Sequence, residues 1–549
     1  MKVDLRLNED RKREYRQKGY WGDATLADYW NMSVLSVPEK TAVVDLQGNR
    51  LTYAELDARA SRLAGWLHSS GIEPGDVVSF QVPSWTEFTV IYVACLKVGV
   101  VVHPILPCLR DEVEYILRKC ESKILFVPTF FREYDYLPMA RKLVNEIPSL
   151  KQVVVVEREK KAPKGWVTLD HILKQSDPLA QPVRCSADDL AALLFTSGTE
   201  SFPKGVMYTH NNIISGLKSF AAVLNLSEYD CILMPAPVGH ATGFHHGVTT
   251  PFILGATSVL MDKFKASQAL ELIEREKCTY TMGVTLIVCD MIQELHNRAY
   301  DISSLRFVLC GGAPSTIGVR QEARDIGFRV MSVYGATESV PHTVCSPDAP
   351  LNKIFNTDGR AVPGVETRVV DAKHNTLPPH IVGEEASRGP NVFMGYLKEP
   401  EMTAKVLGDD GWYYSGDLCT MDEDGYLKIT GRKKDIIIRG GENISSAEVE
   451  GILASHPKVR EVAAVSMPDP RLGERTCVYV CLKDPTNTLT LKEVVAHFSK
   501  QRVAKFKWPE CVRIVDTLPR NPAGKVLKSV LRETIRNEMK ANAAAVGKE

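Results

Sequence analysis

Small hydroxyl residues, glycines and one lysine are concentrated in Phe195–Val206, whose sequence is Phe-Thr-Ser-Gly-Thr-Glu-Ser-Phe-Pro-Lys-Gly-Val. The apolar run Leu190–Leu194 comes directly before this segment and predicts a short buried strand. Backbone N–H groups and hydroxyls in such a loop can surround an anion, and Lys204 can neutralise it. The segment therefore predicts a phosphate-binding loop. It matches the common nucleotide-binding P-loop only in part, because Pro203 and Gly205 stand where that pattern needs glycine and Ser/Thr.

Four later segments carry further groups that suit nucleotide chemistry. A predicted strand, Val308–Cys310, ends in a glycine turn where a flat base could lie against exposed backbone. Tyr334–Glu338 presents an aromatic ring, a hydroxyl and a carboxylate, and Asp417 follows a tight glycine turn. Arg432 can bridge a ribose and a phosphate with its planar guanidinium.

Together these segments resemble the signatures of the adenylate-forming superfamily, which includes acyl-CoA synthetases, aryl-acid ligases, adenylation domains of peptide synthetases and luciferases. The matching motifs are Thr-Ser-Gly-Thr-Glu-Ser-x-Pro-Lys-Gly-Val, Tyr-Gly-x-Thr-Glu, Gly-Trp-Tyr-Tyr-Ser-Gly-Asp, and Leu-Pro-Arg-Asn-Pro-Ala-Gly-Lys near the end. The one departure in the first motif is Ser201, where glycine is usual. The resemblance covers nearly the whole chain, with every motif in order, and is strongest to bacterial short- and medium-chain fatty-acid–CoA ligases.

The resemblance implies a nucleotide site and a set of catalytic groups. It implies catalytic roles for Lys525, Thr337, Glu338 and His240, with Glu338 as the ligand of Mg²⁺, an oxygen-seeking ion. The residues expected to bind ATP or AMP are Thr196, Ser197, Gly198, Thr199, Glu200, Lys204, Gly312, Ala313, Pro314, Tyr334, Gly335, Asp417 and Arg432.

The resemblance also implies sites for the acyl group and for CoA. An acyl pocket is expected from His240, Ala241, Gly335, Ala336 and residues near Gly283. Gly440 and Gly441 are expected to let the pantetheine arm pass close to the backbone, and Lys434 falls on the hinge position. Gly383-Glu384-Glu385 also fits the family pattern and is expected to be a turn.

Three histidines lie within seven residues at His240, His245 and His246. A metal site is disfavoured, because no acidic or thiol partner stands at ligand spacing. His245 and His246 match no role in the family and are expected to be structural histidines with satisfied hydrogen bonds, although one could face the acyl pocket. No acidic residue occurs between Pro235 and Pro251. A buried ammonium without a counter-charge is costly, so an amino-acid substrate is disfavoured and fatty or aryl acids remain.

Composition and charge indicate the number of domains and exclude some classes of binding partner. The 549 residues predict two or more domains, and 67 basic against 67 acidic residues give no bulk attraction to nucleic acid. Thirteen cysteines without a Cys-x-x-Cys pair indicate free thiols in a reducing cytoplasm.

Residues 1–22 are charged and do not have the pattern of a secretory signal. Phe88–Pro107 predicts a buried helix and strand, so we expect no transmembrane segment and only weak peripheral membrane contact.

The order of predicted elements favours an α/β fold. Strands such as Thr41–Asp45 and Asp76–Phe80 alternate with helices such as Leu51–Ser69, as in parallel sheets covered by helices. From Ser445, with Glu448 as a capping box, a smaller α+β region follows. We therefore expect a large N-terminal domain of several subdomains, 1–432, with parallel sheets sandwiched by helices, and a small mobile C-terminal domain, 433–549.

The predicted function is an ATP-dependent fatty-acid–CoA ligase that forms an acyl-AMP, releases pyrophosphate, and transfers the acyl group to CoA with release of AMP. Small molecules are its expected partners, and the oligomeric state is open. An aryl-acid ligase and a ligase that loads a carrier protein share every motif and stay open as alternatives. A non-catalytic acyl-sensing protein is disfavoured, because Lys525 and Glu338 are both present.

Overall fold

The computed structural model describes residues 5–6, 8–196, 203–311, 317–501, 503–521 and 524–546. These residues form two compact units. One unit is made of the chain up to Thr367 together with Ser387–Tyr413, and the other of Arg368–Ala386 and the chain from Tyr414 onward. No helix in the described ranges combines the length and the apolar character that crossing a membrane requires.

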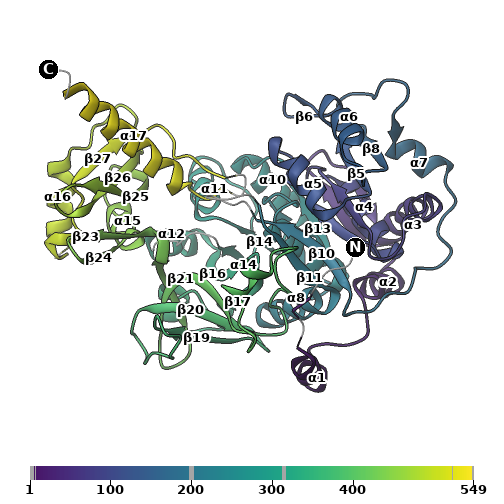
Figure 1. Ribbon diagram of the computed structural model, residues 1–549, viewed down its shortest axis with the longest axis horizontal. Helices are drawn as coiled ribbons and strands as arrows, with labels where there is room; N and C mark the ends of the chain where they lie inside the picture. Colours follow the sequence, from purple (N-terminus) through teal and green to yellow (C-terminus); the bar gives the residue numbers. More distant parts are fainter. Residues whose placement is uncertain are drawn as a thin grey trace. The chain divides into compact units, whose positions relative to one another are not determined.

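The first unit contains a seven-stranded sheet, in which β10 and the edge strand β11 come directly before and after the predicted phosphate loop in the sequence (Figure 1). All its strands run parallel except the edge strand β11, which pairs antiparallel with β10. In spatial order the strands are β11 (Gly205–Thr209), β10 (Leu190–Phe195), β4 (Val101–Pro104), β3 (Val77–Phe80), β5 (Ile124–Pro128), β8 (Gln152–Val156) and β9 (Val167–Thr168). The accompanying helices are α3 (Tyr53–Ser69), α4 (Thr86–Val98), α5 (Asp111–Cys120), α6 (Leu137–Glu146), α7 (Leu169–Gln175) and α8 (His210–Leu224).

Helix α4 and strand β4 confirm the prediction of a buried helix and strand in the most apolar part of the sequence. Every strand residue of β4 is buried, and α4 is buried on all sides except at Glu87. Lys97 of α4 is buried and pairs with Asp57 of α3 at 2.7 Å, which compensates its charge. His103 of β4 is buried and lies 2.8 Å from the Ser79 hydroxyl, and burial lowers its pKa to about 3.

The second sheet of this unit has nine strands and carries the Tyr334–Glu338 motif. Its core strands are parallel, while β2, β17 and β18 pair antiparallel at its ends. In order they are β18 (Arg360–Ala361), β17 (Ser339–Val344), β16 (Arg329–Ala336), β15 (Phe307–Cys310), β14 (Tyr280–Gly283), β12 (Cys231–Met234), β13 (Thr257–Leu260), β1 (Thr41–Asp45) and β2 (Arg50–Thr52).

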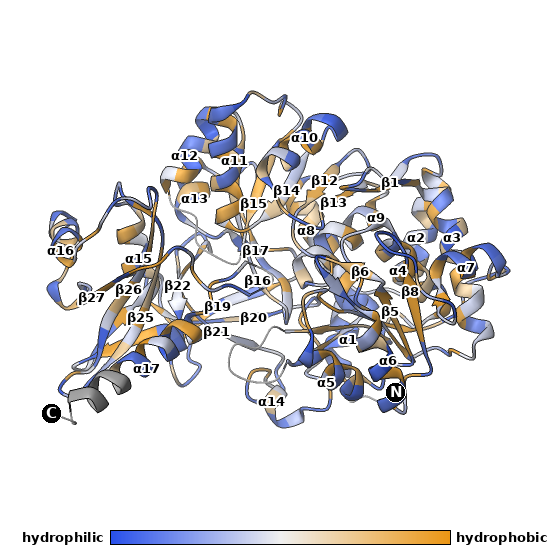
Figure 2. Cartoon of the chain, turned by 90° about the horizontal axis from the view of Figure 1, so that it is seen from above, coloured by the Kyte–Doolittle hydropathy of each residue, from blue (hydrophilic) through white to orange (hydrophobic). Residues whose placement is uncertain are grey.

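Alternating side chains bury both faces of the nine-stranded sheet. Helices α10 (Ala266–Glu276), α11 (Thr285–Asn297) and α12 (Ile317–Ile326) cover one face, where Leu233 and Val308 are buried (Figure 2). The other face packs against α8, a π-helix at Gly243–Thr249 and α9 (Thr250–Leu254). This pattern of a parallel sheet between helices is the predicted α/β architecture. The unit also contains α1 (Glu9–Gln17), α2 (Leu26–Ser36), α13 (Leu351–Asn356), α14 (Pro400–Ala404), β6 (Phe130–Phe131) and β7 (Tyr134–Asp135).

The second unit combines two sheets with three helices. Most of a four-stranded sheet belongs to it, in the order β19 (Glu366–Val370), β20 (Gly383–Arg388), β21 (Tyr413–Met421) and β22 (Leu427–Arg432). The prediction of a turn at Gly383–Glu385 was wrong, because these residues begin β20 and are buried. These residues are strand residues inside the sheet, where the Glu384 side chain accepts a hydrogen bond from the Gly416 N–H, next to Asp417.

The remaining sheet and helices of this unit form the predicted small α+β region. The strands are β23 (Ile436–Arg439), β24 (Glu442–Ser445), β25 (Val459–Asp469), β26 (Gly473–Leu482) and β27 (Cys511–Ile514), with α15 (Ser446–Ala454), α16 (Leu491–Lys500) and α17 (Lys528–Val546). Alternate residues of β25 and β26 pack toward α15 and α16 on one face and toward α17 on the other. Ser445 caps α15 by accepting from the Glu448 backbone N–H. The Glu448 side chain pairs with Lys507 at 2.7 Å, so the expected capping box is half formed.

Candidate active site

The base of the predicted phosphate loop is an antiparallel hairpin. Phe195 of β10 pairs with Gly205 of β11, and the Thr196 N–H donates to the Lys204 carbonyl at 3.0 Å. A Cβ atom on Gly205 would lie 2.9 Å from the Phe195 ring, so glycine is needed for this close packing. Thr196 and Lys204 are therefore brought together at the two ends of the loop. The predicted ligands Ser197, Gly198, Thr199 and Glu200 lie outside the described residues.

A tyrosine connects the loop lysine with the predicted magnesium ligand. The Lys204 ammonium lies 4.8 Å from the centre of the Tyr396 ring, and the Tyr396 hydroxyl donates to Glu338 Oε1 at 2.7 Å. Burial and the Glu338 carboxylate raise the pKa of Tyr396, so its hydroxyl stays protonated and acts as a donor. Two successive polar contacts thus form a continuous line from Lys204 through Tyr396 to Glu338.

Backbone pairing along residues 391–397 holds this line in place. The Met394 N–H donates to Met207 of β11, and the Phe393 N–H donates to the Glu338 carbonyl at 2.9 Å. The buried Tyr208 hydroxyl donates to the Thr337 carbonyl. The end of β16 is therefore tied to β11 by both backbone and side chains. The sequence did not predict Tyr396 or Tyr208, because their contacts with Glu338 and Thr337 join segments that lie far apart in the chain.

The predicted base-stacking residue lies at the exposed edge of the same hairpin. Tyr334 of β16 is half-buried, with its ring centre 5.0 Å from that of His342 on β17. A Cβ atom on Gly335 would lie 3.0 Å from the Ser339 carbonyl oxygen, so this position favours glycine. The predicted Gly312, Ala313 and Pro314 lie outside the described residues.

The histidine-rich segment forms the turn and π-helix after β12. His240 is half-buried and its Nδ1 accepts from the Thr242 N–H at 3.3 Å, while Ala241 is buried. His245 lies with its ring 5.4 Å from that of Tyr208, whose hydroxyl holds Thr337. The π-helix therefore packs against the strand that positions the Thr337 backbone. Short π-helical segments are frequent at functional sites.

The expectation that His245 and His246 have satisfied hydrogen bonds was wrong. Both ring nitrogens of His245, and Nδ1 of His246, are buried without a hydrogen-bond partner among the described residues. Their neighbours are aromatic: Tyr208 and Phe244 for His245, and Phe220 for His246. Burial lowers the pKa of His246 to about 3 and that of His245 well below the usual value, so both rings are neutral.

The second unit brings together the predicted ribose and phosphate residues. Asp417 of β21 pairs in register with Arg432 of β22, and Arg432 Nε lies 2.7 Å from Asp417 Oδ1. Asp417 is buried, and the Gly416 N–H before it donates to Glu384, which also pairs with Lys433 at 2.7 Å. The carboxylate and the guanidinium are therefore held at adjacent positions of a rigid sheet.

Lys525 belongs to a tight loop of the same unit. Its backbone N–H donates to Asn521 Oδ1, and the Asn521 N–H donates back to the Lys525 carbonyl, both at 2.8 Å. Burial, followed by the positive charge of Arg432, lowers the pKa of Lys525 to about 8, while Asp417 and Asp435 act in the opposite direction. The lysine thus lies within electrostatic reach of the ribose and phosphate residues. A perturbed pKa of this kind is typical of functional groups.

The predicted hinge and CoA residues follow β22 directly. Lys434 is an exposed residue in a 3₁₀-helical turn, Lys433–Asp435. Gly440 and Gly441 connect β23 to β24 with φ of +58° and +90°. A two-residue hairpin turn with positive φ at both residues favours glycine. The turn therefore explains these two glycines structurally, in addition to their predicted role beside CoA.

Glu338 offers one free oxygen to a metal ion. Its Oε1 accepts from Tyr396, and Oε2 makes no hydrogen bond with a residue that the structure describes. No group of three or more His, Cys, Asp or Glu suited to a metal occurs among the described residues. A single carboxylate oxygen beside a phosphate site fits Mg²⁺, which keeps several waters and binds substrate phosphates.

Comparison with known proteins agrees with this geometry. The family described as AMP-binding enzyme matches residues 32–397, and the AMP-binding enzyme C-terminal domain matches residues 448–525. The chain belongs to the AMP-binding enzyme family. The prediction of an adenylate-forming acyl-CoA synthetase is thereby confirmed, and the protein is an AMP-forming acid–thiol ligase.

Several members of the AMP-binding enzyme family are similar over almost the whole chain. A medium-chain fatty-acid–CoA ligase of Escherichia coli K12 is 51% identical over 540 residues, which cover 98% of this chain and 95% of that protein. The pyochelin synthase PchD of Pseudomonas aeruginosa is 32% identical and covers 97% of this chain and 96% of that protein. The crystal structure of ATP-bound MatB from Rhodopseudomonas palustris has a TM-score of 0.85 and 30% identity, covering 93% of this chain and 99% of that chain. The α/β fold is confirmed by this likeness.

Proposed function

We propose that this enzyme is a fatty-acid–CoA ligase that acts on short- or medium-chain acids, with ATP and CoA as co-substrates. The observation that carries the proposal is the placement of Lys525 beside Asp417 and Arg432 in a chain of this family. The choice of fatty acid is supported by the 51% identical Escherichia coli ligase and by the absence of an acidic residue between Pro235 and Pro251.

The first half-reaction joins two anions. The substrate carboxylate must approach the α-phosphate of ATP, so catalysis depends mainly on neutralising charge and aligning the reactants. Lys525 supplies a cation between the carboxylate and the phosphate, and Lys204 with the loop after Thr196 holds phosphate oxygens. Asp417 accepts from the ribose hydroxyls, and Arg432 donates to ribose and phosphate.

Three side chains of the first unit are assigned to nucleotide binding in this proposal. Tyr334 provides a ring face for the adenine, and the Thr337 hydroxyl donates to a phosphate oxygen. Glu338 would hold Mg²⁺ through Oε2, with Oε1 fixed by Tyr396. When bound, the ion neutralises phosphate charge and assists the departure of pyrophosphate.

The second half-reaction needs no nucleophile from the protein. The thiolate of CoA attacks the acyl carbonyl of the adenylate, the bond to the phosphate oxygen breaks, and AMP leaves. His240 lines the entrance for the carboxylate in this proposal, and Ala241, Gly335 and Ala336 line the acyl pocket with it. Gly440 and Gly441 border the path of the pantetheine arm. We place the boundary between the catalytic domains at residues 432 and 433, with Lys434 as the hinge.

A reducing cytoplasmic location is part of the proposal. All thirteen cysteines are free thiols, and nine of them are buried, as expected in a reducing compartment. The proposed substrates are all small molecules of the cell interior.

A panel of acids tests the substrate class. AMP release is measured with CoA and a series of acids from acetate to palmitate, together with benzoate and salicylate. We expect the highest kcat/KM for an acid of medium chain length. A preference for benzoate or salicylate would instead support an aryl-acid ligase, and adenylate formation without CoA consumption would support transfer to a carrier protein.

A further inference from the structure

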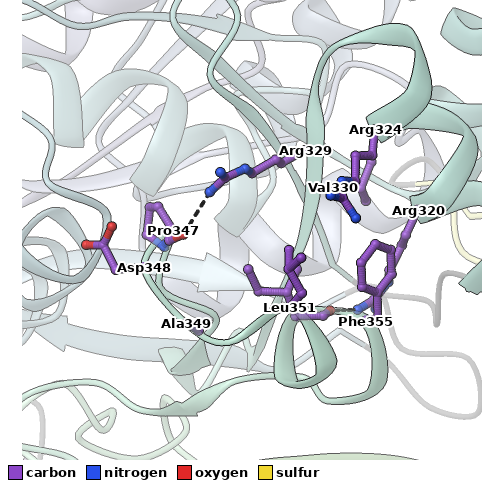
Figure 3. A pocket seen from close by; sticks show the side chains of 10 residues that line it. Arg320, Arg324, Arg329, Val330, Pro347, Asp348, Ala349, Leu351 and Phe355 are labelled. Atoms are coloured by element: carbon purple, nitrogen blue, oxygen red, sulfur yellow. Dashed lines mark hydrogen bonds between the residues drawn. The ribbon is translucent and has the colours of Figure 1, made fainter.

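A cavity of about 380 Å³ lies in the first unit, and none of the predicted nucleotide-binding residues is among those that line it. It is bordered by α12, the beginning of β16, the loop at Pro347–Ala349 and α13 (Figure 3). Strand β16 begins at this cavity with Arg329 and ends at Ala336, next to Thr337 and Glu338. Eight strand residues extend over about 25 Å, so the cavity and the predicted phosphate site lie at opposite ends of one strand. We call it the arginine pocket.

The charge in the arginine pocket is unbalanced. Arg320, Arg324 and Arg329 border it, with Asp348 as the one acidic residue among its described lining. Arg320 is buried and engaged, because it donates to the Ile354 carbonyl and to the Ser332 hydroxyl. Arg329 donates to the Pro347 carbonyl at 2.9 Å but has no carboxylate partner among the described residues.

Arg324 is exposed, and its guanidinium makes no hydrogen bond or ion pair with a described residue. The acidic residues of its own helix are engaged elsewhere: Glu322 with His296 at 2.9 Å, and Asp325 with Gln321. The Asp348 carboxylate accepts from Asn225. Two guanidinium groups at the mouth of the pocket therefore keep donors available for an anion.

Apolar side chains form the rest of the pocket. Val330 and Ile354 are buried in its floor, Phe355 is half-buried, and Leu351 is 44% exposed beside them. Figure 3 shows Leu351 and Phe355 among the side chains that surround the space, together with the three arginines. A ligand that fills this space would contact cations on one side and hydrocarbon on the other.

We propose that the arginine pocket binds a phosphomonoester with a compact apolar or aromatic body. A guanidinium presents parallel donors that match phosphate oxygens, and two cations suit the charge of a phosphomonoester dianion. A volume of about 380 Å³ falls in the range of small-molecule sites. None of the proposed steps of acyl transfer uses these residues, so the site is independent of the proposed function.

Binding of small anions to the full-length protein tests the proposal. Phenyl phosphate, inorganic phosphate and benzoate are titrated separately and followed by ligand-observed NMR. We expect phenyl phosphate to bind most tightly, because inorganic phosphate lacks the apolar body and benzoate carries a single charge. Benzoate binding as tightly as phenyl phosphate, and weakened to the same extent by Arg324→Gln with Arg329→Gln, would overturn the assignment of a phosphate ligand.

Variants locate the binding site. Arg324→Gln combined with Arg329→Gln should raise the Kd for phenyl phosphate at least about tenfold, since each charge-assisted hydrogen bond contributes on the order of tenfold. The matched control is Arg59→Gln combined with Arg184→Gln, two exposed arginines outside the pocket, which should leave the Kd unchanged. If the double variant fails to fold, Arg324→Gln alone is used, because that side chain makes no described contact that folding needs. Equal Kd values for the pocket variant and the control would overturn the proposal.

Discussion

At the scale of single residues, Lys525 has the most specific role in the proposed chemistry. Its charge is needed while the carboxylate approaches the α-phosphate, and not while the thiol attacks. Lys525→Ala should therefore lower the rate of adenylation by about two to three orders of magnitude. Thioester formation from preformed acyl-adenylate should stay largely intact. Single-turnover measurements of both half-reactions decide this, and an equal loss in both would contradict the assignment.

The pKa of Lys525 predicts how adenylation depends on pH. Burial and the neighbouring Arg432 lower this pKa to about 8, whereas lysine in water titrates near 10.5. The charged form is the active one, so kcat/KM for adenylation should fall as pH rises through about 8, by roughly tenfold per pH unit above it. Lys525→Arg, if active, should lack this alkaline limb because arginine stays charged. A wild-type rate that is constant up to pH 10 would contradict the prediction.

At the scale of elements, the site depends on residues 391–397, which hold β11 against the end of β16. Tyr396→Phe removes the hydrogen bond to Glu338 Oε1 without removing the ring. We expect adenylation to fall roughly tenfold or more, and the Mg²⁺ concentration for half-maximal rate to rise, since a bond to a charged group is lost. Tyr300→Phe removes a similar 2.7 Å bond to Glu294 outside the site and should change neither quantity. Equal effects of the two variants would assign Tyr396 a structural role only.

The elements also show how far sequence reasoning reaches. Strand β10, helix α4 and the cap of α15 are local features, encoded by apolar runs and by Ser445, and they were predicted. The proposed site residues are likewise read from local motifs, and their roles stay predictions. Tyr396 could not be found, because its contacts with Lys204 and Glu338 depend on pairing across the chain. The unpartnered rings of His245 and His246 depend on packing of a π-helix against aromatic side chains, which a motif does not encode.

At the scale of the whole molecule, the proposed mechanism requires two arrangements of the domains. Lys525 must first stand at the carboxylate, and a thiol must then approach the same carbon, so one domain has to rotate between the steps. Lys434, in a helical turn directly after Arg432, is the proposed hinge.

Lys434→Pro tests the rotation. Proline fixes φ near −65°, which suits a helical turn but resists other conformations. We expect the variant to retain adenylation and to lose thioester formation by orders of magnitude, whereas Lys434→Ala should retain both. Pyrophosphate release and CoA consumption are measured separately in single turnovers. If both half-reactions fall together, the substitution has damaged the fold and the hinge proposal loses its support.

The buried histidines of the first unit have a consequence for the whole chain in acid. His103, His210, His245 and His246 are buried and neutral in the folded state. Burial lowers the pKa of His103 and His246 to about 3 and that of His210 to about 4, and it lowers the pKa of His245 well below its usual value. An unfolded chain binds a proton at each of these rings below about pH 6.5. Unfolding near pH 5 should thus take up nearly four protons at these rings, and the free energy of unfolding should fall by about 5 kcal/mol per pH unit from them alone. Denaturant midpoints between pH 7 and pH 5, followed with a proton-sensitive dye, measure this uptake. The first unit is therefore expected to lose stability steeply as the pH falls from 7 to 5. A denaturant midpoint that is constant over this range would refute the expectation.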